Sequence, residues 1–171
     1  MKGYLQVYTG DGKGKTTAAM GTALRALMAG WRVYIGQFLK NGTSGEILAL
    51  QQLGKTLTVE PYGHGGELTG REKEAYCQAA RDGFQKAKEA LLCGKYDLVI
   101  LDECNVALAL GYLDVAEVLD LLRMRPEGVE CILTGRGAIP EVVEMADLVT
   151  EMKEIKHYFA QGVMARKGIE E

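Results

Sequence analysis

A glycine-rich loop between an expected strand and an expected helix constrains this chain more than any other stretch. The segment Thr9-Gly10-Asp11-Gly12-Lys13-Gly14-Lys15-Thr16-Thr17 follows the apolar run 4–8 and precedes a helical pattern at 18–29. Glycines let successive backbone N–H groups point inward, and the next helix adds unpaired N–H groups and the positive end of its dipole. The order strand, loop, helix therefore predicts a phosphate-binding loop.

One position of this loop departs from the usual pattern G-x-x-x-x-G-K-[ST]. Thr9 stands where the first glycine is expected, and Gly10 follows it. The pattern still predicts that Lys15 bridges phosphate oxygens and that Thr16 holds Mg²⁺. A turn that is rich in glycine and lysine by chance is the alternative, which the flanking elements disfavour. We interpret the whole stretch as nucleotide-binding: Thr9, Gly10, Asp11, Gly12, Lys13, Gly14, Lys15, Thr16 and Thr17.

Length and charge limit the classes of protein that fit. The 171 residues predict a single nucleotide-binding domain, 1–171, with 153–171 as a C-terminal tail. A net charge of −3 gives no general attraction to nucleic acids or anionic membranes. No export signal and no long apolar run are visible, so we expect a cytoplasmic protein. The cysteines lie far apart and predict buried, reduced thiols: Cys77, Cys93, Cys104 and Cys131.

Two adjacent carboxylates follow the most apolar run of the chain. Residues 98–101 predict a strand buried on both faces, and Asp102 and Glu103 stand at its carboxyl end. The phosphate loop leaves its own strand at the same edge of a parallel sheet. Acids at this place in P-loop proteins orient Mg²⁺, so Thr16, Asp102 and Glu103 are the predicted metal site. The alternative is that the two acids merely cap the next helix.

Other polar residues are expected at the same edge. A strand at 31–38, reached through a helical crossover, predicts a right-handed parallel βαβ unit and presents Gln37 and Lys40. Arg136 follows a strand at 129–134 and is a candidate for a phosphate or ribose contact. The loop 61–68 holds three glycines and a proline, which suits a cover over a site or an ordinary surface loop.

The remaining pattern completes an open α/β sheet, mostly parallel, with helices on both faces. Thr69 and Glu72 have capping-box spacing ahead of a long helix that ends near Leu92. The other expected elements are a helix at 47–53, a strand at 57–60, a helix from 114, a helix at 140–145 and a strand at 147–152.

Taken together, five blocks of sequence resemble a known family, the P-loop ATP:corrinoid adenosyltransferases, over nearly the whole chain. The phosphate loop alone indicates only a nucleotide, whereas five blocks in order are much more specific. The blocks are 8–19, 101–103, 133–136, 146–152 and the tail residues Lys156, His157, Gly162 and 168–170.

The resemblance implies a RecA-like fold, a homodimer, and transfer of the 5′-deoxyadenosyl group of ATP to a reduced Co(I) corrinoid with release of triphosphate. It implies Mg²⁺ or Mn²⁺, a possible electron-donor protein, and Lys15, Glu103 and Arg136 as catalytic residues. Family members carry bulky aromatic residues in the loop after the third strand, where this chain offers Tyr62 and His64 as corrinoid-facing candidates. A small P-loop kinase or NTPase and a non-catalytic nucleotide-binding module remain the alternatives.

Overall fold

A six-stranded parallel sheet forms the centre of the molecule. The computed structural model describes residues 2–40, 47, 49–50, 56–63 and 73–170. The strand order is β3-β2-β4-β5-β1-β6, and every neighbouring pair is parallel. The strands are β1 (Leu5–Thr9), β2 (Val33–Phe38), β3 (Leu57–Tyr62), β4 (Leu98–Asp102), β5 (Glu130–Thr134) and β6 (Leu148–Glu151).

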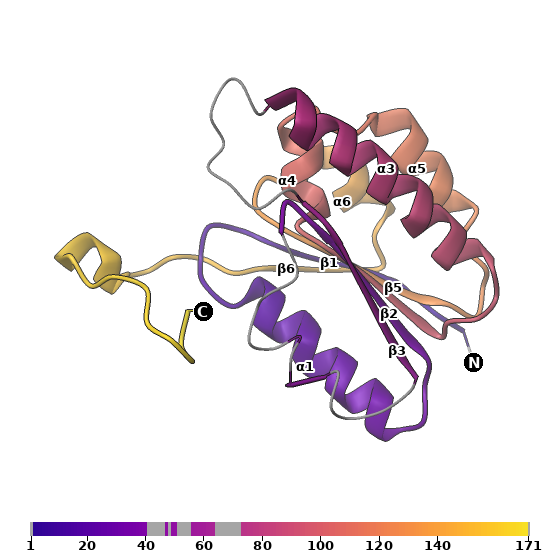
Figure 1. Cartoon of the computed structure of the whole chain (residues 1–171), viewed down its shortest axis with the longest axis horizontal. Coiled ribbons are helices and arrows are strands. Elements are labelled where there is room, and N and C mark those ends of the chain that lie inside the picture. Colours follow the sequence, from indigo (N-terminus) through magenta and orange to yellow (C-terminus); the bar gives the residue numbers. More distant parts are fainter. Residues whose placement is uncertain (1, 41–46, 48, 51–55, 64–72, 171) are drawn as a thin grey trace.

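Helices cover both faces of this sheet, as the sequence predicted. Helix α1 (Lys15–Met28) lies on one face, and the other long helices lie on the opposite face (Figure 1). Parallel strands need such crossovers, and the crossovers bury both sides of the sheet. The opposite face carries α3 (Lys73–Leu92), α4 (Cys104–Ala109), α5 (Val115–Arg123) and α6 (Pro140–Met145).

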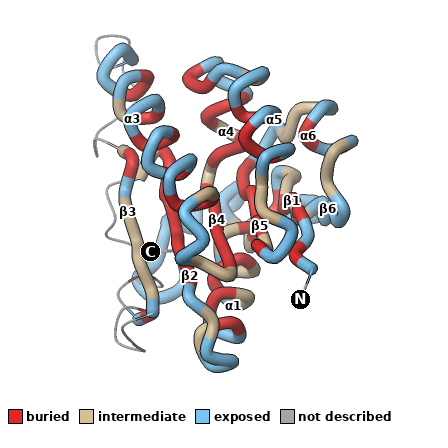
Figure 2. The backbone as a smooth tube through the Cα atoms, turned by 90° about the vertical axis from the view of Figure 1, so that its right-hand side faces the viewer, coloured by how far each residue is buried: buried red, intermediate tan, exposed pale blue. Residues whose placement is uncertain are grey.

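The core divides into two clusters, one on each side of the sheet. Alanines on α1, such as Ala19 and Ala23, are fully buried against the branched side chains of the central strands. The larger cluster lies under α3, α4 and α5, and the central strands run buried through the middle of the molecule (Figure 2). The buried apolar run predicted at 98–101 is confirmed, because every residue of β4 is buried.

Some local expectations need correction. The third strand continues to Tyr62, so Pro61 and Tyr62 belong to β3 and not to a loop; β3 is an edge strand, where proline is tolerated. Helix α4 was not predicted. Cys93 is exposed, whereas the other three cysteines are buried, and all four are free thiols. Residues 47, 49 and 50 are helical, while the capping box at Thr69 lies outside the described residues.

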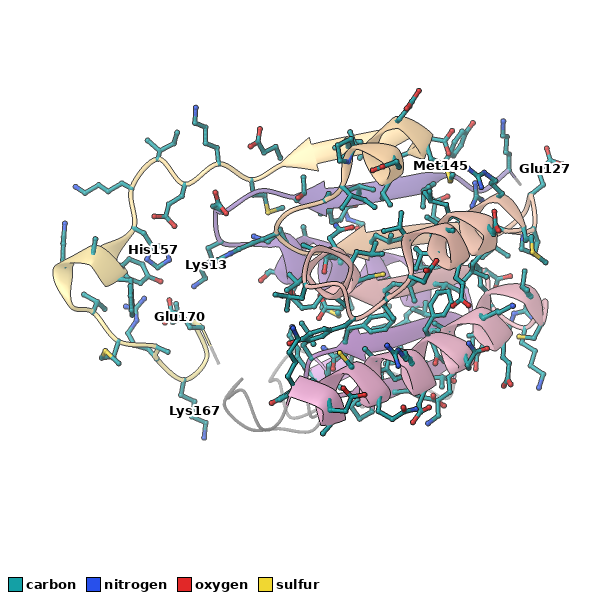
Figure 3. The ribbon with its side chains drawn as sticks, turned by 90° about the horizontal axis from the view of Figure 1, so that it is seen from above. Lys13, Glu127, Met145, His157, Lys167 and Glu170 are labelled. Carbon is teal, nitrogen blue, oxygen red and sulfur yellow. The ribbon has the colours of Figure 1, made fainter. Side chains whose placement is uncertain are left out.

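The chain beyond β6 leaves the sheet as an extended arm. It contains one short 3₁₀ helix, η1 (Tyr158–Gln161), and then turns back toward the phosphate loop (Figures 1 and 3). Among the residues that the structure describes, no helix is both long and apolar enough to cross a membrane.

Candidate functional site

The segments that follow four strands and the end of the arm line an open cavity of about 590 Å³. Because β1, β2, β4 and β5 are parallel, the segments that follow them emerge at one edge of the sheet. The lining residues come from the phosphate loop, from the three neighbouring strand ends and from the arm: Asp11, Gly12, Lys13, Gly14, Lys15, Thr16, Thr17, Lys40, Glu103, Val106, Arg136, His157, Ile169 and Glu170.

Backbone contacts fix the shape of the phosphate loop. Gly10 and Gly14 have φ values of 92° and 117°, a region that side chains rarely adopt. The Gly12 N–H donates to the Met152 carbonyl at 2.6 Å, and a Cβ on Gly12 would lie 2.7 Å from that oxygen. Thr9 replaces the usual first glycine, and its hydroxyl accepts a hydrogen bond from the Ala138 N–H at 3.2 Å.

Lys15 begins α1, and its side chain folds back across the loop. Its ammonium donates to the Gly10 and Gly12 carbonyls, both at 2.7 Å. Burial, followed by the nearby Arg136 guanidinium, lowers the pKa of Lys15 from its ordinary value. The loop thus holds a cation beside the free N–H groups at the start of α1, an arrangement that favours anions.

Asp102 lies at the bottom of the cavity and is 0% exposed. Its Oδ1 accepts hydrogen bonds from the Thr16 hydroxyl at 2.8 Å and the Thr134 hydroxyl at 2.7 Å. Its Oδ2 accepts from the Lys40 ammonium at 2.7 Å and the Gln37 amide at 3.2 Å. Burial alone would raise the pKa of Asp102, but Lys40 and the two hydroxyls hold it below its ordinary value. We call Asp102 and these four donors the floor.

Glu103 differs from its neighbour in charge environment. Its backbone has φ 59° at the start of α4, and its side chain makes no capping hydrogen bond, so the capping alternative is not supported. Burial, and then the negative charge of Asp102, raises the pKa of Glu103. Its backbone N–H donates to the Thr134 hydroxyl at 3.0 Å.

Oxygen atoms of the floor, together with the Glu103 carboxylate beside it, suit a hard divalent cation. Within the described ranges, no group of three or more histidine, cysteine, aspartate or glutamate side chains is arranged to hold a metal. The site offers instead the Thr16 hydroxyl, the Asp102 and Glu103 carboxylates, and the buried Gln37 Oε1, which has no hydrogen-bond partner among the described residues. Mg²⁺ keeps several waters and takes phosphate oxygens, so few protein oxygens are enough.

The opposite side of the cavity is formed by the arm, whose end meets the phosphate loop at Lys13. The Lys13 ammonium lies 2.8 Å from Glu170 Oε1, 2.8 Å from the Ile169 carbonyl oxygen and 3.3 Å from the Tyr158 hydroxyl. Glu170 also accepts a hydrogen bond from the Tyr158 hydroxyl and from Arg166. Figure 3 shows Lys13, His157 and Glu170 facing one another across this junction, while Lys167 points away. We call Lys13, Tyr158, Arg166 and Glu170 the rim.

The structure therefore gathers most of the residues that the sequence singled out. The phosphate loop, Lys40, Glu103 and Arg136 line one cavity, and Asp102 lies beneath it. The exposed Arg136 has no hydrogen bond to another described residue.

Tyr62 is placed differently from the prediction. Its side chain is 4% exposed, its ring packs edge-on against Phe38 at 5.0 Å between centroids, and its hydroxyl bonds to that of Tyr34. It is a core residue in this structure and presents no surface to a corrinoid. The reason is local, because Pro61 and Tyr62 continue the pairing of β3 with β2. His64 lies outside the described residues.

Sequence reasoning singled out Lys13 but missed Thr134 as a site residue and the rim residues of the arm, which are Tyr158, Arg166 and Glu170. Thr134 ends β5, which lies between the strand of the phosphate loop and the strand of Asp102. The strand order, once known, would have pointed to the last residue of the intervening strand. Glu170 carried no comparable signal beyond its place in the tail.

Comparison with known proteins identifies the family. The family described as ATP:corrinoid adenosyltransferase BtuR/CobO/CobP matches residues 1–170. The chain belongs to the ATP:corrinoid adenosyltransferase family. Corrinoid adenosyltransferases of Escherichia coli K12 and of Pseudomonas aeruginosa are 40% and 36% identical to it, over 99% of this chain and 86% and 84% of theirs. The corrinoid adenosyltransferase CobA of Salmonella typhimurium is 40% identical over 99% of this chain and 86% of its own length.

A solved structure supports the fold of this adenosyltransferase family member. The flagellar accessory protein FlaH of Methanocaldococcus jannaschii superposes with a TM-score of 0.59 at 18% identity, covering 88% of this chain and 71% of FlaH. At this identity the likeness concerns the fold alone, which is the RecA-like P-loop architecture that the sequence predicted.

Proposed function

We propose that this protein transfers the 5′-deoxyadenosyl group of ATP to the Co(I) centre of a corrinoid and releases triphosphate. The observation that carries the proposal is a phosphate loop joined to a buried carboxylate floor in a member of the adenosyltransferase family. Relatives named corrinoid adenosyltransferases favour this reaction over a kinase, an NTPase or a non-catalytic module.

The reaction makes few demands on acid–base chemistry. The Co(I) electron pair attacks the ribose 5′-carbon and forms a cobalt–carbon bond, while the C5′–O bond breaks and triphosphate leaves with the electron pair of that C5′–O bond. Since the nucleophile carries no proton, no general base is needed. The protein has to position the 5′-carbon and stabilise the leaving polyanion, which are entropic and electrostatic tasks.

We assign the second task to the cations around the cavity. Lys15 and the start of α1 would bind the triphosphate, with Lys13 and Arg136 adding positive charge from the sides. Glu103 remains a proposed catalytic residue, in a position to order groups near the metal. All of residues 9–17 are proposed to bind the nucleotide.

Mg²⁺, or Mn²⁺ in its place, would be held by Thr16, Asp102 and Glu103. When bound, such an ion neutralises charge on phosphate oxygens. Of the two corrinoid-facing candidates, Tyr62 is buried and is no longer proposed as a contact. His64 stays a proposal. A homodimer, an electron-donor protein that reduces the corrinoid to Co(I), and a cytoplasmic location are proposed from the family resemblance.

One anaerobic assay tests the reaction. The protein is incubated with ATP, Mg²⁺ and reduced cobalamin or cobinamide, while the corrin spectrum and the phosphate products are followed. Adenosylcorrinoid with triphosphate supports the proposal. ADP with an unchanged corrin would instead identify a kinase or ATPase, and binding without turnover would identify a module.

The variant Lys15→Ala tests the role of the loop in this reaction. We expect kcat/KM to fall at least about 100-fold, because a positioned cation on the leaving group is lost, while circular dichroism stays unchanged. The exposed Lys88 on α3 provides the matched control, and Lys88→Ala should retain full activity. Near-normal turnover of Lys15→Ala would remove the loop lysine from the mechanism.

A further inference from the structure

Lys40 occupies an unusual position in the floor. Its ammonium lies 2.7 Å from Asp102 Oδ2 and 3.4 Å from the Thr16 hydroxyl oxygen. These are two of the three groups proposed to hold the divalent cation. An ammonium and a metal ion cannot share the same carboxylate oxygen and hydroxyl at contact distance, so the two cations compete for one place.

The backbone around Lys40 is built to present it there. Leu39 and Glu103 are the two non-glycine residues with positive φ in the described part of the chain, at 60° and 59°. They directly flank the ion pair, one before Lys40 and one after Asp102. Gly63 packs against the same turn, since a Cβ on it would lie 2.4 Å from the backbone nitrogen of Lys40. Strained conformations of this kind persist where surrounding contacts hold them, and they gather at functional sites.

The electrostatics explain why a cation has to be present. Asp102 is completely buried and ionised, and its other three donors, Thr16, Thr134 and Gln37, are neutral. Within the described residues Lys40 is its one ion-pair partner. A buried carboxylate that loses its only cation is strongly unfavourable. The floor thus needs a positive charge even without a metal.

Two further features allow a metal ion to replace the Lys40 ammonium at Asp102. The Lys40 side chain is 30% exposed, so its ammonium can move into the cavity without crossing the core. The Gln37 amide donates to the same Asp102 oxygen as Lys40 does, and its own Oε1 is buried with no hydrogen-bond partner in the described part of the chain. That oxygen is suited to accept a hydrogen bond from a metal-bound water.

We propose that Lys40 is a tethered counter-ion that occupies the metal place when no divalent ion is bound. With a divalent ion held by Thr16 and Asp102, the Lys40 ammonium would leave Asp102 and would serve as a phosphate-binding group in the cavity. Lys40 is therefore a positioning residue that couples metal entry to the supply of one more positive charge for triphosphate. The proposal rests on the metal site of the proposed function. It adds that a divalent ion enters this site in exchange for the Lys40 ammonium.

Metal binding without nucleotide or corrinoid tests the exchange. Mn²⁺ is titrated into the full chain and followed by electron paramagnetic resonance, for wild type, Lys40→Met and Lys40→Arg. We expect Lys40→Met to bind one Mn²⁺ about ten-fold more tightly than wild type, because the competing ammonium is gone. Lys40→Arg, which keeps a cation, should remain near wild type. Equal Mn²⁺ affinity of wild type and Lys40→Met would overturn the proposal.

Thermal unfolding supplies a second readout. In EDTA, Lys40→Met should melt below wild type, and added Mg²⁺ should restore most of the loss. The double variant Lys40→Met, Asp102→Asn should show no such rescue. If Lys40→Met does not fold, Lys40→Gln replaces it, since glutamine is neutral yet still donates to Asp102. A Mg²⁺-independent loss in the neutral variants would also overturn the proposal.

These measurements are separate from adenosyl transfer. If the assay of the preceding section fails while the Mn²⁺ result holds, the counter-ion proposal stands and the reaction is wrong. If adenosyl transfer is observed and the Mn²⁺ affinities are equal, the reaction stands and the counter-ion proposal fails.

Discussion

The floor and the rim contain ion pairs of nearly equal length in opposite surroundings. Lys40 and Asp102 are 2.7 Å apart with Asp102 0% exposed, whereas Lys13 and Glu170 are 2.8 Å apart with side chains 41% and 16% exposed. Water screens a surface pair, while a buried charge depends entirely on its partners. The comparison shows that the distance between the charged atoms does not decide how much the protein depends on each ion pair. The burial of the charges does.

Topology adds a second difference. The floor is assembled from the ends of β2, β4 and β5 and from α1, which the central sheet holds at fixed spacing. The rim depends on the return of an arm that has few other anchors, with Arg166 stacked 4.9 Å from the centre of the Tyr158 ring. We therefore expect substitutions in the floor to affect both folding and chemistry, and substitutions in the rim to affect ligand binding alone.

The largest effect is expected from Asp102→Ala. The change removes the acceptor of Thr16, Thr134 and Gln37 together, and the stability lost should be about 3 kcal/mol. Urea unfolding measures it. The matched control is Asp97→Ala, which lies immediately before the same strand; its partner Arg32 is exposed, and the loss should be much smaller. Equal losses at Asp97 and Asp102 would break the distinction between buried and exposed pairs.

A smaller effect of opposite sign is expected from Glu103→Gln. The folded-state pKa of Glu103 is raised above its ordinary 4.5, so the folded state favours the protonated carboxyl. The wild type therefore loses stability as pH rises from its ordinary pKa through the raised one. Glu103→Gln removes this loss, and its advantage in urea unfolding should be present at neutral pH and absent near pH 4. The exposed Glu144→Gln serves as control. A pH-independent difference would contradict the assignment.

The smallest effect on folding is expected at the rim. Glu170→Gln removes the negative charge that pairs with Lys13, so the ammonium keeps only its neutral contacts with Ile169 and Tyr158 and binds phosphate more readily. We expect an unchanged melting temperature and a KM for ATP lowered about two- to five-fold, which is the range of an exposed salt bridge. Steady-state kinetics at low salt measure it, with Lys167→Ala as an arm control, since Lys167 points away from the junction (Figure 3). A higher KM would mean that the rim assists ATP binding instead of opposing it.

The sequence predicted the local parts of the site and missed those that depend on topology. The phosphate loop and Asp102 were accessible because each is coded by contiguous residues next to its own strand. Thr134 required the strand order, since only the position of β5 between β1 and β4 puts its hydroxyl on Asp102. Tyr62 was misplaced because glycines after it suggested a loop, while backbone pairing with β2 extended the strand. The contact between Lys13 and Glu170 joins distant residues for which no periodic pattern exists.

The arm has both of its ends on the same short loop. It starts after Met152, whose carbonyl accepts from the Gly12 N–H, and it finishes at Glu170 on the neighbouring Lys13. The chain between forms a ring closed by the contacts of Lys13 with Tyr158, Ile169 and Glu170, so Glu170 stays tethered close by when its ion pair opens. A tether of this length keeps the carboxylate at an effective concentration in the millimolar range. Any phosphate that binds Lys13 therefore competes with a carboxylate that is tethered beside it.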